Sequence, residues 1–240
     1  MRIHTHDGKP GFLGYCANVH PGESLADVLH AVRALASDVR KQLGTDALSL
    51  GLWLSRRSAD ELAAHGCNEL QRALADAGIF VVTLNGFPYG NFHAEVVKRQ
   101  VYHPDLCSPE RRTYLSTLAK ILVQLLPEDA SEGTISTLPI GHRDEPLDLL
   151  ERGDASRQRA SQAAAAQLCL LTTELAALRA QTGKSIRICI EPEPGCWLET
   201  TDDAVQFWQH TLPEAARRAG VTEALIAQHL GLCYDTCHQA

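Results

Sequence analysis

Strand-like and helix-like segments alternate along the 240 residues of this chain, and this alternation restricts its fold more than any other feature. Short apolar runs predict six strands, at residues 12–19, 47–54, 79–84, 133–139, 185–190 and 231–234. Segments with the apolar period of an amphipathic helix separate them, at residues 24–43, 58–77, from 108, 154–182, 201–219 and 222–230. Consecutive βα units of this kind build a parallel sheet covered by helices, so the sequence predicts an α/β fold.

Two parallel architectures accommodate such units, the doubly wound open sheet and the (β/α)8 TIM barrel. A doubly wound dinucleotide-binding sheet has a glycine-rich turn after its first strand. Residues 18–23 of this chain contain a single glycine, Gly22. We therefore predict a TIM barrel that occupies residues 1–240 as a single domain with about six βα units. The chain ends six residues after Tyr234, so strands seven and eight of the barrel would be missing. Because an open barrel leaves two strand edges unpaired, we expect the chain to be a fragment of a longer protein.

Composition narrows the range of partners. The chain has 22 basic and 29 acidic residues, a net charge of −7, and no cluster of Lys and Arg, which argues against nucleic acid and for a small-molecule substrate. No apolar run is long enough to span a membrane, so direct membrane insertion is not expected. The eight cysteines form no CxxC pair and some lie in strand-like runs, which is typical of reduced thiols in a cytoplasmic protein. The oligomeric state stays open, and a homo-oligomer is one arrangement that the sequence allows.

Acidic and imidazole side chains follow the last two predicted strands. Glu191 and Glu193 come directly after strand 185–190, and Asp235 and His238 follow strand 231–234. Because ligands collect at the carboxyl ends of parallel strands, these side chains should meet at one mouth. Carboxylates and imidazole suit Mn²⁺, Co²⁺, Zn²⁺ or Mg²⁺, so we predict a divalent metal ion bound by Glu191 and Asp235. The alternative is that these carboxylates cap helices or form ion pairs.

Other side chains are expected at the same mouth. His238 is in reach of a substrate hydroxyl, a metal ion or a backbone carbonyl, and Glu193 is either a substrate contact or an exposed loop acid. The predicted substrate-binding residues are His20, Asn85, Tyr89, His93 and Glu193. Residues 85–93 combine turn formers with aromatic side chains, which is typical of a loop that closes over a ligand, although a packed structural loop has the same composition.

The residues at both strand ends resemble a known superfamily. Glu191 and the run Asp235-Thr236-Cys237-His238 are similar to the strand-five and strand-six ends of xylose-isomerase-like TIM barrels, which include sugar-phosphate isomerases and epimerases, keto-hexose epimerases and the endonuclease IV family. Nearly the whole chain resembles the EboE-type metabolite traffic proteins, a bacterial branch of that superfamily. The segments that carry this likeness are residues 15–23, 84–90, 136–141, 191–196 and 233–238.

The resemblance implies roles for three of these residues. Glu191 and Asp235 match metal ligands, and His238 matches a residue that contacts substrate. In the epimerases the strand-five Glu is also one of two acid/base groups. The second Glu, on strand eight, and a His ligand, on strand seven, have no counterpart in this chain. The EboE-type group is linked by its gene neighbourhood to moving a metabolite precursor toward the cell envelope.

These observations lead to one expected activity and two alternatives. We expect a metal-dependent isomerase or epimerase of a small polyhydroxylated or carbonyl-bearing metabolite, with Glu191 as ligand and base and His238 as a catalytic residue that orients substrate oxygens. The first alternative is a non-catalytic protein that carries a metabolite in the same barrel mouth. The second, a phosphodiesterase acting on abasic DNA, needs several metal ions and a basic groove, which the acidic composition disfavours.

Overall fold

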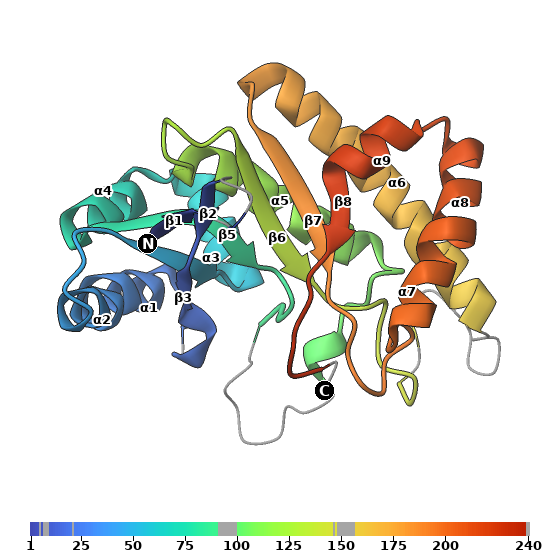
Figure 1. Cartoon of the computed structure of the whole chain (residues 1–240), viewed down its shortest axis with the longest axis horizontal. Coiled ribbons are helices and arrows are strands. Elements are labelled where there is room, and N and C mark those ends of the chain that lie inside the picture. The colour runs from blue at the N-terminus through green and yellow to red at the C-terminus, as the bar shows by residue number, and fades with distance from the viewer. Residues whose placement is uncertain are drawn as a thin grey trace.

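The computed structural model describes residues 1–4, 6, 10–20, 22–90, 100–145, 147 and 157–238. Its central element is a six-stranded sheet in which every neighbouring pair is parallel and the strand order is the order of the sequence (Figure 1). The strands are β3 (Gly14–Cys16), β4 (Leu48–Trp53), β5 (Ile79–Asn85), β6 (Glu132–Thr137), β7 (Ser185–Ile190) and β8 (Leu230–Leu232). A sheet in which each strand lies beside the next one in sequence, always in the same direction around the sheet, is the arrangement found in a (β/α)8 barrel.

Helices connect the strands and pack against one face of the sheet. They are α1 (Leu25–His30), α2 (Ser37–Gln42), α3 (Arg56–His65), α4 (Asn68–Ala77), α5 (Pro109–Leu125), α6 (Arg157–Thr182), α7 (Thr201–Gln206), α8 (Leu212–Ala219) and α9 (Glu223–His229). In Figure 1, α5 and α6 lie behind β6 and β7. α8 packs on α6, and α9 contacts both α6 and β7. The prediction of an α/β barrel-type fold with about six βα units is therefore confirmed in its class, its parallel pairing and its strand order.

The core lies between the sheet and these helices. One continuous apolar cluster extends from Ala17 to Leu230, and strand residues such as Leu50, Val81 and Ile188 are at most 1% exposed. Each fully buried side chain of this size contributes about 1.5–3 kcal/mol of transfer free energy, so the packing of helices on the sheet dominates stability. The opposite face of the sheet is more polar, and on it Thr134 donates a hydrogen bond to Thr83 at 2.8 Å.

Three helical segments differ from the prediction. The segment predicted over 201–219 contains a π-helical stretch, η4 (Phe207–Thr211), between α7 and α8. The helix predicted over 58–77 is two helices, α3 and α4. The first ends at Gly66, whose φ of 84° is incompatible with an α-helix. The helix predicted over 24–43 is nearly continuous, but a π-helical stretch, η2 (Ala31–Ala36), joins α1 to α2. It begins as expected, with Ser24 and Asp27 in a reciprocal capping box.

The predicted first and last strands are shorter than expected, and one hairpin was missed. Residues 12–19 divide into the end of β2 (Pro10–Phe12), then β3 and a 3₁₀ turn, η1 (Ala17–Val19), while β8 ends at Leu232. β1 (Arg2–His4) and β2 form an antiparallel hairpin. The Phe12 ring contacts the edge of Phe80 at 5.8 Å, so this hairpin covers part of the polar face of the sheet.

Two further predictions concern composition. All eight cysteines are free thiols, as predicted. Among the described residues, no helix is both long enough and apolar enough to cross a membrane.

A buried arginine holds the loops that follow β5. Arg111 on α5 is fully buried and donates hydrogen bonds to the carbonyl oxygens of Gly86, Phe87 and Pro104 at 2.8–2.9 Å. Backbone carbonyls buried beside a guanidinium are thereby satisfied, and two loop segments far apart in sequence are tied to one helix. One of these segments follows η3 (Gln100–Tyr102), which lies near the candidate site described below.

Candidate metal centre

The site forms where β7 and β8 end. Glu191 directly follows β7, and its backbone N–H donates to the Thr137 carbonyl oxygen at 2.9 Å, which continues the pairing with β6. The N–H of Cys233 donates to the Ile190 carbonyl oxygen at 2.8 Å, so the chain beyond β8 stays beside β7. This pairing brings Asp235 alongside Glu191, as expected for neighbouring parallel strands.

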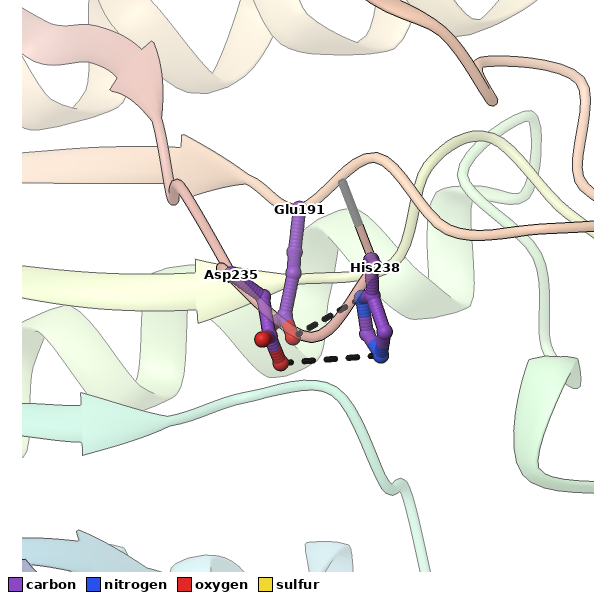
Figure 2. A group of neighbouring side chains, drawn as sticks. All are labelled: Glu191, Asp235 and His238. Atoms are coloured by element: carbon purple, nitrogen blue, oxygen red, sulfur yellow. Dashed lines mark ion pairs between the residues drawn. The ribbon is translucent and has the colours of Figure 1, made fainter. Parts of the chain in front are cut away.

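Glu191, Asp235 and His238 converge on one point (Figure 2). Each offers one ligand atom, and these atoms all lie within 4.8 Å of one another. The Glu191 Oε1 atom is 3.8 Å from His238 Nδ1, and the Asp235 Oδ2 atom is 3.5 Å from His238 Nε2. All three side chains are partly buried, with 16–32% of their surface exposed, so a ligand can reach them.

Hydrogen bonds orient two of these side chains. The backbone N–H of Cys237 donates to Asp235 Oδ1 at 2.7 Å, which fixes the carboxylate within its own turn. The Nδ1 atom of His238 lies 3.2 Å from the Pro192 carbonyl oxygen, and because a carbonyl only accepts, Nδ1 carries the proton. In the neutral ring Nε2 is then a bare acceptor, which is the usual arrangement of a histidine that binds metal through one nitrogen.

The electrostatics of the cluster favour a bound cation. Burial raises the pKa of Glu191, and the nearby Asp235 and Glu193 carboxylates raise it further, against the lowering effect of His238. Within the described part of the chain, no Lys or Arg forms an ion pair with Glu191 or Asp235, and His238 is the basic side chain beside them. With Nδ1 protonated, the bare Nε2 atom of His238 and the Asp235 carboxylate are two acceptors 3.5 Å apart. Two such acceptors repel unless a proton or a cation lies between them, so the donor set fits a divalent ion.

A thiol lies against the same carboxylate. Burial raises the pKa of Cys233 to about 12, and its hydrogen bond to Glu191 raises it as well. The thiol is therefore protonated at neutral pH and acts as a weak donor to Glu191.

Glu193 lies beside this cluster, next to His238. Its Oε1 atom lies 3.9 Å from His238 Nε2, and its Oε2 atom accepts a hydrogen bond from the Tyr102 hydroxyl at 3.0 Å. Tyr102 was not among the predicted site residues. It lies 91 residues before Glu193, and no local pattern in the sequence joins the two.

His20 and Asn85 make local contacts instead. The Nε2 atom of His20 lies 2.7 Å from the Tyr15 hydroxyl, at the β3 edge of the sheet. The Asn85 side-chain oxygen accepts from the Phe87 backbone N–H at 2.9 Å, which closes a tight turn after β5. Within the described residues, neither side chain contacts the Glu191 cluster, and their substrate-binding role stays a prediction.

Tyr89 and His93 complete the predicted set. The Tyr89 ring packs edge-on against Tyr114 at 5.1 Å and lies 5.6 Å from the guanidinium of Arg111. It also borders a cavity of about 670 Å³ lined by residues that include Glu23 and Arg56. His93 lies outside the described residues.

Comparisons with known proteins give structural similarities only. No known protein family matches the sequence, and no curated protein matches it. A xylose isomerase domain protein from Alicyclobacillus acidocaldarius subsp. acidocaldarius has 16% identity and a TM-score of 0.49, covering 94% of this chain and 64% of its own. The IolI protein with a bound zinc atom has 12% identity and a TM-score of 0.48 over 94% of this chain and 64% of its own. A probable 3-DHS dehydratase, AsbF, involved in petrobactin synthesis in Bacillus anthracis, has 14% identity and a TM-score of 0.45 over 95% and 64%.

This chain therefore spans about 64% of the length of each of these three structures. All three TM-scores lie below 0.5, so the fold class rests on the strand order of the sheet and the placement of its helices.

Proposed function

We propose that the protein binds one divalent metal ion through Glu191, Asp235 and His238 and catalyses isomerisation or epimerisation of a small polyhydroxylated or carbonyl-bearing metabolite. The observation that carries this proposal is the orientation of His238, whose Nδ1 atom is 3.2 Å from the Pro192 carbonyl oxygen. That contact leaves Nε2 as an acceptor facing Asp235, and an acceptor pair of this kind calls for a cation between its members.

The chain's own residues define what such a site does. A divalent ion bound there supplies Lewis-acid polarisation of a substrate carbonyl or hydroxyl oxygen. In an isomerisation, Glu191 takes a proton from the hydroxyl-bearing carbon beside the carbonyl and returns it to the carbonyl carbon, while the hydroxyl proton moves to the former carbonyl oxygen. In an epimerisation, a proton returns to the opposite face of the same carbon. Neither reaction consumes an oxidant or reductant. His238 serves this chemistry as a ligand, because its Nδ1 atom bonds to Pro192 and its Nε2 atom is the one that faces the ion. Partial burial of all three side chains lowers the local dielectric and strengthens each of these interactions.

We place this activity in the processing or traffic of a metabolite precursor in the cytoplasm. The resemblance of residues 15–23 and 233–238 to the EboE-type proteins supports the pathway, and the eight free thiols support the compartment. We also infer that His20, Asn85, Tyr89 and His93 contribute to substrate binding, as their positions after the first and third barrel strands predict.

Hydrogen exchange with solvent tests the proposed reaction. The full-length protein, loaded in turn with Mn²⁺, Co²⁺, Zn²⁺ or Mg²⁺, would be incubated in D₂O with a panel of keto sugars and sugar phosphates. We expect deuterium to enter a C–H bond beside the carbonyl of at least one substrate, at a rate that Glu191→Gln lowers by about 10²-fold or more. Glu128→Gln, which changes an exposed carboxylate in the turn before β6, is the matched control. Tight binding of a sugar without exchange would contradict catalysis and favour a carrier.

A further inference from the structure

A tyrosine outside the predicted site holds one of the carboxylates beside it. The Tyr102 hydroxyl donates to Glu193 Oε2 at 3.0 Å, and the Cys196 thiol lies 3.9 Å from the same oxygen. Because a carboxylate only accepts, the phenol hydroxyl is the donor in this hydrogen bond. The Oε2 atom of Glu193 is thus occupied, and only Oε1 is available to a ligand.

The available oxygen faces His238 at the border of the candidate metal centre. Glu193 Oε1 lies 3.9 Å from His238 Nε2, the same nitrogen that faces Asp235 Oδ2 at 3.5 Å. The bare acceptor of the imidazole is therefore flanked by a carboxylate from each strand end. Glu193 follows Glu191 by two residues, so one loop presents two carboxylates to this side of the mouth.

The surroundings of Tyr102 keep its hydroxyl in place. The side chain is only 8% exposed, and its ring lies between Phe87, at 5.7 Å, and His142, at 5.2 Å. In Figure 1, η3, which contains this residue, lies close to the C-terminal end of the chain, in agreement with the Tyr102–Glu193 and Glu193–His238 contacts.

The loop that carries Glu193 is also held on its other side. The Arg143 guanidinium donates from Nε to the Cys196 carbonyl oxygen at 2.8 Å and pairs with the Glu199 carboxylate. Glu199 in turn accepts from the Gly195 backbone N–H at 2.9 Å. The loop is therefore fixed independently of Tyr102, so removal of the phenol oxygen frees the Glu193 carboxylate without releasing the loop.

We propose that Glu193 is a further carboxylate of the metal centre and that Tyr102 is the positioning residue that aims its Oε1 atom at the bound ion. This inference rests on the proposed function, because it requires the ion held by Glu191, Asp235 and His238. Partners that orient a metal-binding group typically change metal affinity by about 10- to 100-fold when they are removed. Without the Tyr102 hydroxyl, the Glu193 Oε2 atom keeps only the weak thiol donor of Cys196, so fewer of the chains in solution present Oε1 to the ion.

Titration of the intact protein with Co²⁺ tests this inference, because the visible absorption of bound Co²⁺ reports its ligands and geometry. We expect Glu193→Gln to weaken Co²⁺ binding about 10- to 100-fold and Tyr102→Phe to weaken it about 3- to 10-fold, each with an altered spectrum. In the double variant, Tyr102→Phe should add less than about twofold to the effect of Glu193→Gln, because Tyr102 acts through that carboxylate. If Tyr102 had a merely structural role, Tyr102→Phe would weaken Co²⁺ binding by the same factor in the wild type and in Glu193→Gln.

Tyr114→Phe is the matched control. Its hydroxyl is fully buried and donates to the Leu54 carbonyl oxygen at 2.5 Å, so the variant loses a comparable buried hydrogen bond away from the cluster. It should keep the Co²⁺ affinity and spectrum of the wild type. An equal loss in Tyr114→Phe, an unchanged affinity in Tyr102→Phe, or full additivity in the double variant would overturn the inference while leaving the metal site intact. Failure of the wild type itself to bind Co²⁺ would overturn the proposed function and this inference together.

Discussion

The imidazole of His238 hydrogen-bonds through Nδ1 to the backbone carbonyl oxygen of Pro192, at 3.2 Å. Pro192 belongs to the loop after β7 and His238 to the turn after β8, so this bond joins the two strand ends that form the candidate metal centre. It also decides which nitrogen is protonated. The resulting acceptor, Nε2, faces the carboxylates of Asp235 and Glu193 at 3.5 and 3.9 Å, and this arrangement is the physical basis for expecting a cation.

Metal binding should stabilise the folded protein. Ligand at 100 times its dissociation constant adds about 2.7 kcal/mol to the free energy of unfolding. For a chain of this size, that corresponds to a rise of about 5–10 °C in Tm. Thermal unfolding with and without Co²⁺ or Zn²⁺, and after chelation, measures this shift. In Asp235→Asn the shift should be largely lost, whereas Glu128→Gln should retain it; a full shift in Asp235→Asn would count against Asp235 as a ligand.

The buried guanidinium of Arg111 should be essential to stability. Lysine cannot reproduce its three hydrogen bonds to the carbonyl oxygens of Gly86, Phe87 and Pro104, so some of these buried acceptors lose their partners. We expect Arg111→Lys to lower the free energy of unfolding by about 2–4 kcal/mol, measured by urea denaturation. Arg112→Lys alters a neighbouring, partly exposed ion pair with Glu174 and should cost less than about 1 kcal/mol. Similar costs for both variants would contradict this role of Arg111.

Acid should destabilise the protein through His229. This residue is fully buried, its Nδ1 atom lies 2.8 Å from the Ile186 carbonyl oxygen, and burial lowers its pKa. The unfolded chain takes up this proton near pH 6.5, whereas the folded chain takes it up only at lower pH. The contribution of His229 to the free energy of unfolding should therefore be constant above about pH 7. It should fall as the pH drops through 6.5 toward the pKa of His229 in the folded protein.

Urea denaturation between pH 5 and 8 measures this dependence. His229→Gln should flatten the profile in that window, and His210→Gln, at an exposed position in the π-helical stretch 207–211, should leave it unchanged. A profile in His229→Gln that matches the wild type would exclude His229 as the source of the acid sensitivity.

Thiol reactivity should divide the cysteines by burial. Cys16 and Cys237 are exposed, while Cys196 is fully buried and its pKa is raised to about 12, chiefly by burial. Because the thiolate is the reactive form, a thiol reagent should modify two cysteines rapidly in the native protein and all eight after denaturation. Mass spectrometry of the labelled peptides identifies them. Fewer than eight labelled cysteines in denaturant would point to a disulfide.

The strand ends could be predicted from the sequence because their signal is local. β7 is buried along most of its length and stops at Glu191, so the apolar run itself marks where the acidic side chain emerges. The parallel order of the strands then brings Asp235 to the same edge. The break between α3 and α4 was less visible, because the apolar period continues from Leu62 to Leu70 across Gly66.

Contacts that depend on distant pairing could not be predicted in this way. Tyr102 in η3 reaches Glu193 across 91 residues of sequence, and Arg111, which bonds to the Pro104 carbonyl oxygen just after η3, lies on the next helix. The hairpin of β1 and β2 has no strong apolar alternation, and it is held by contacts of Phe12 and Arg2 with Phe80. Residues with such roles are found from the fold, since nothing in their own neighbourhood in the sequence distinguishes them.

The most direct test of the account is the metal content of the full-length protein, purified without chelator and measured by elemental mass spectrometry. The account predicts about one Mn, Co, Zn or Mg ion per chain, with a clear loss in Glu191→Gln and no loss in Glu128→Gln. Absence of metal from the wild type, even after reconstitution, would contradict it. Glu191, Asp235 and His238 would then be polar contacts for a metabolite that the protein carries.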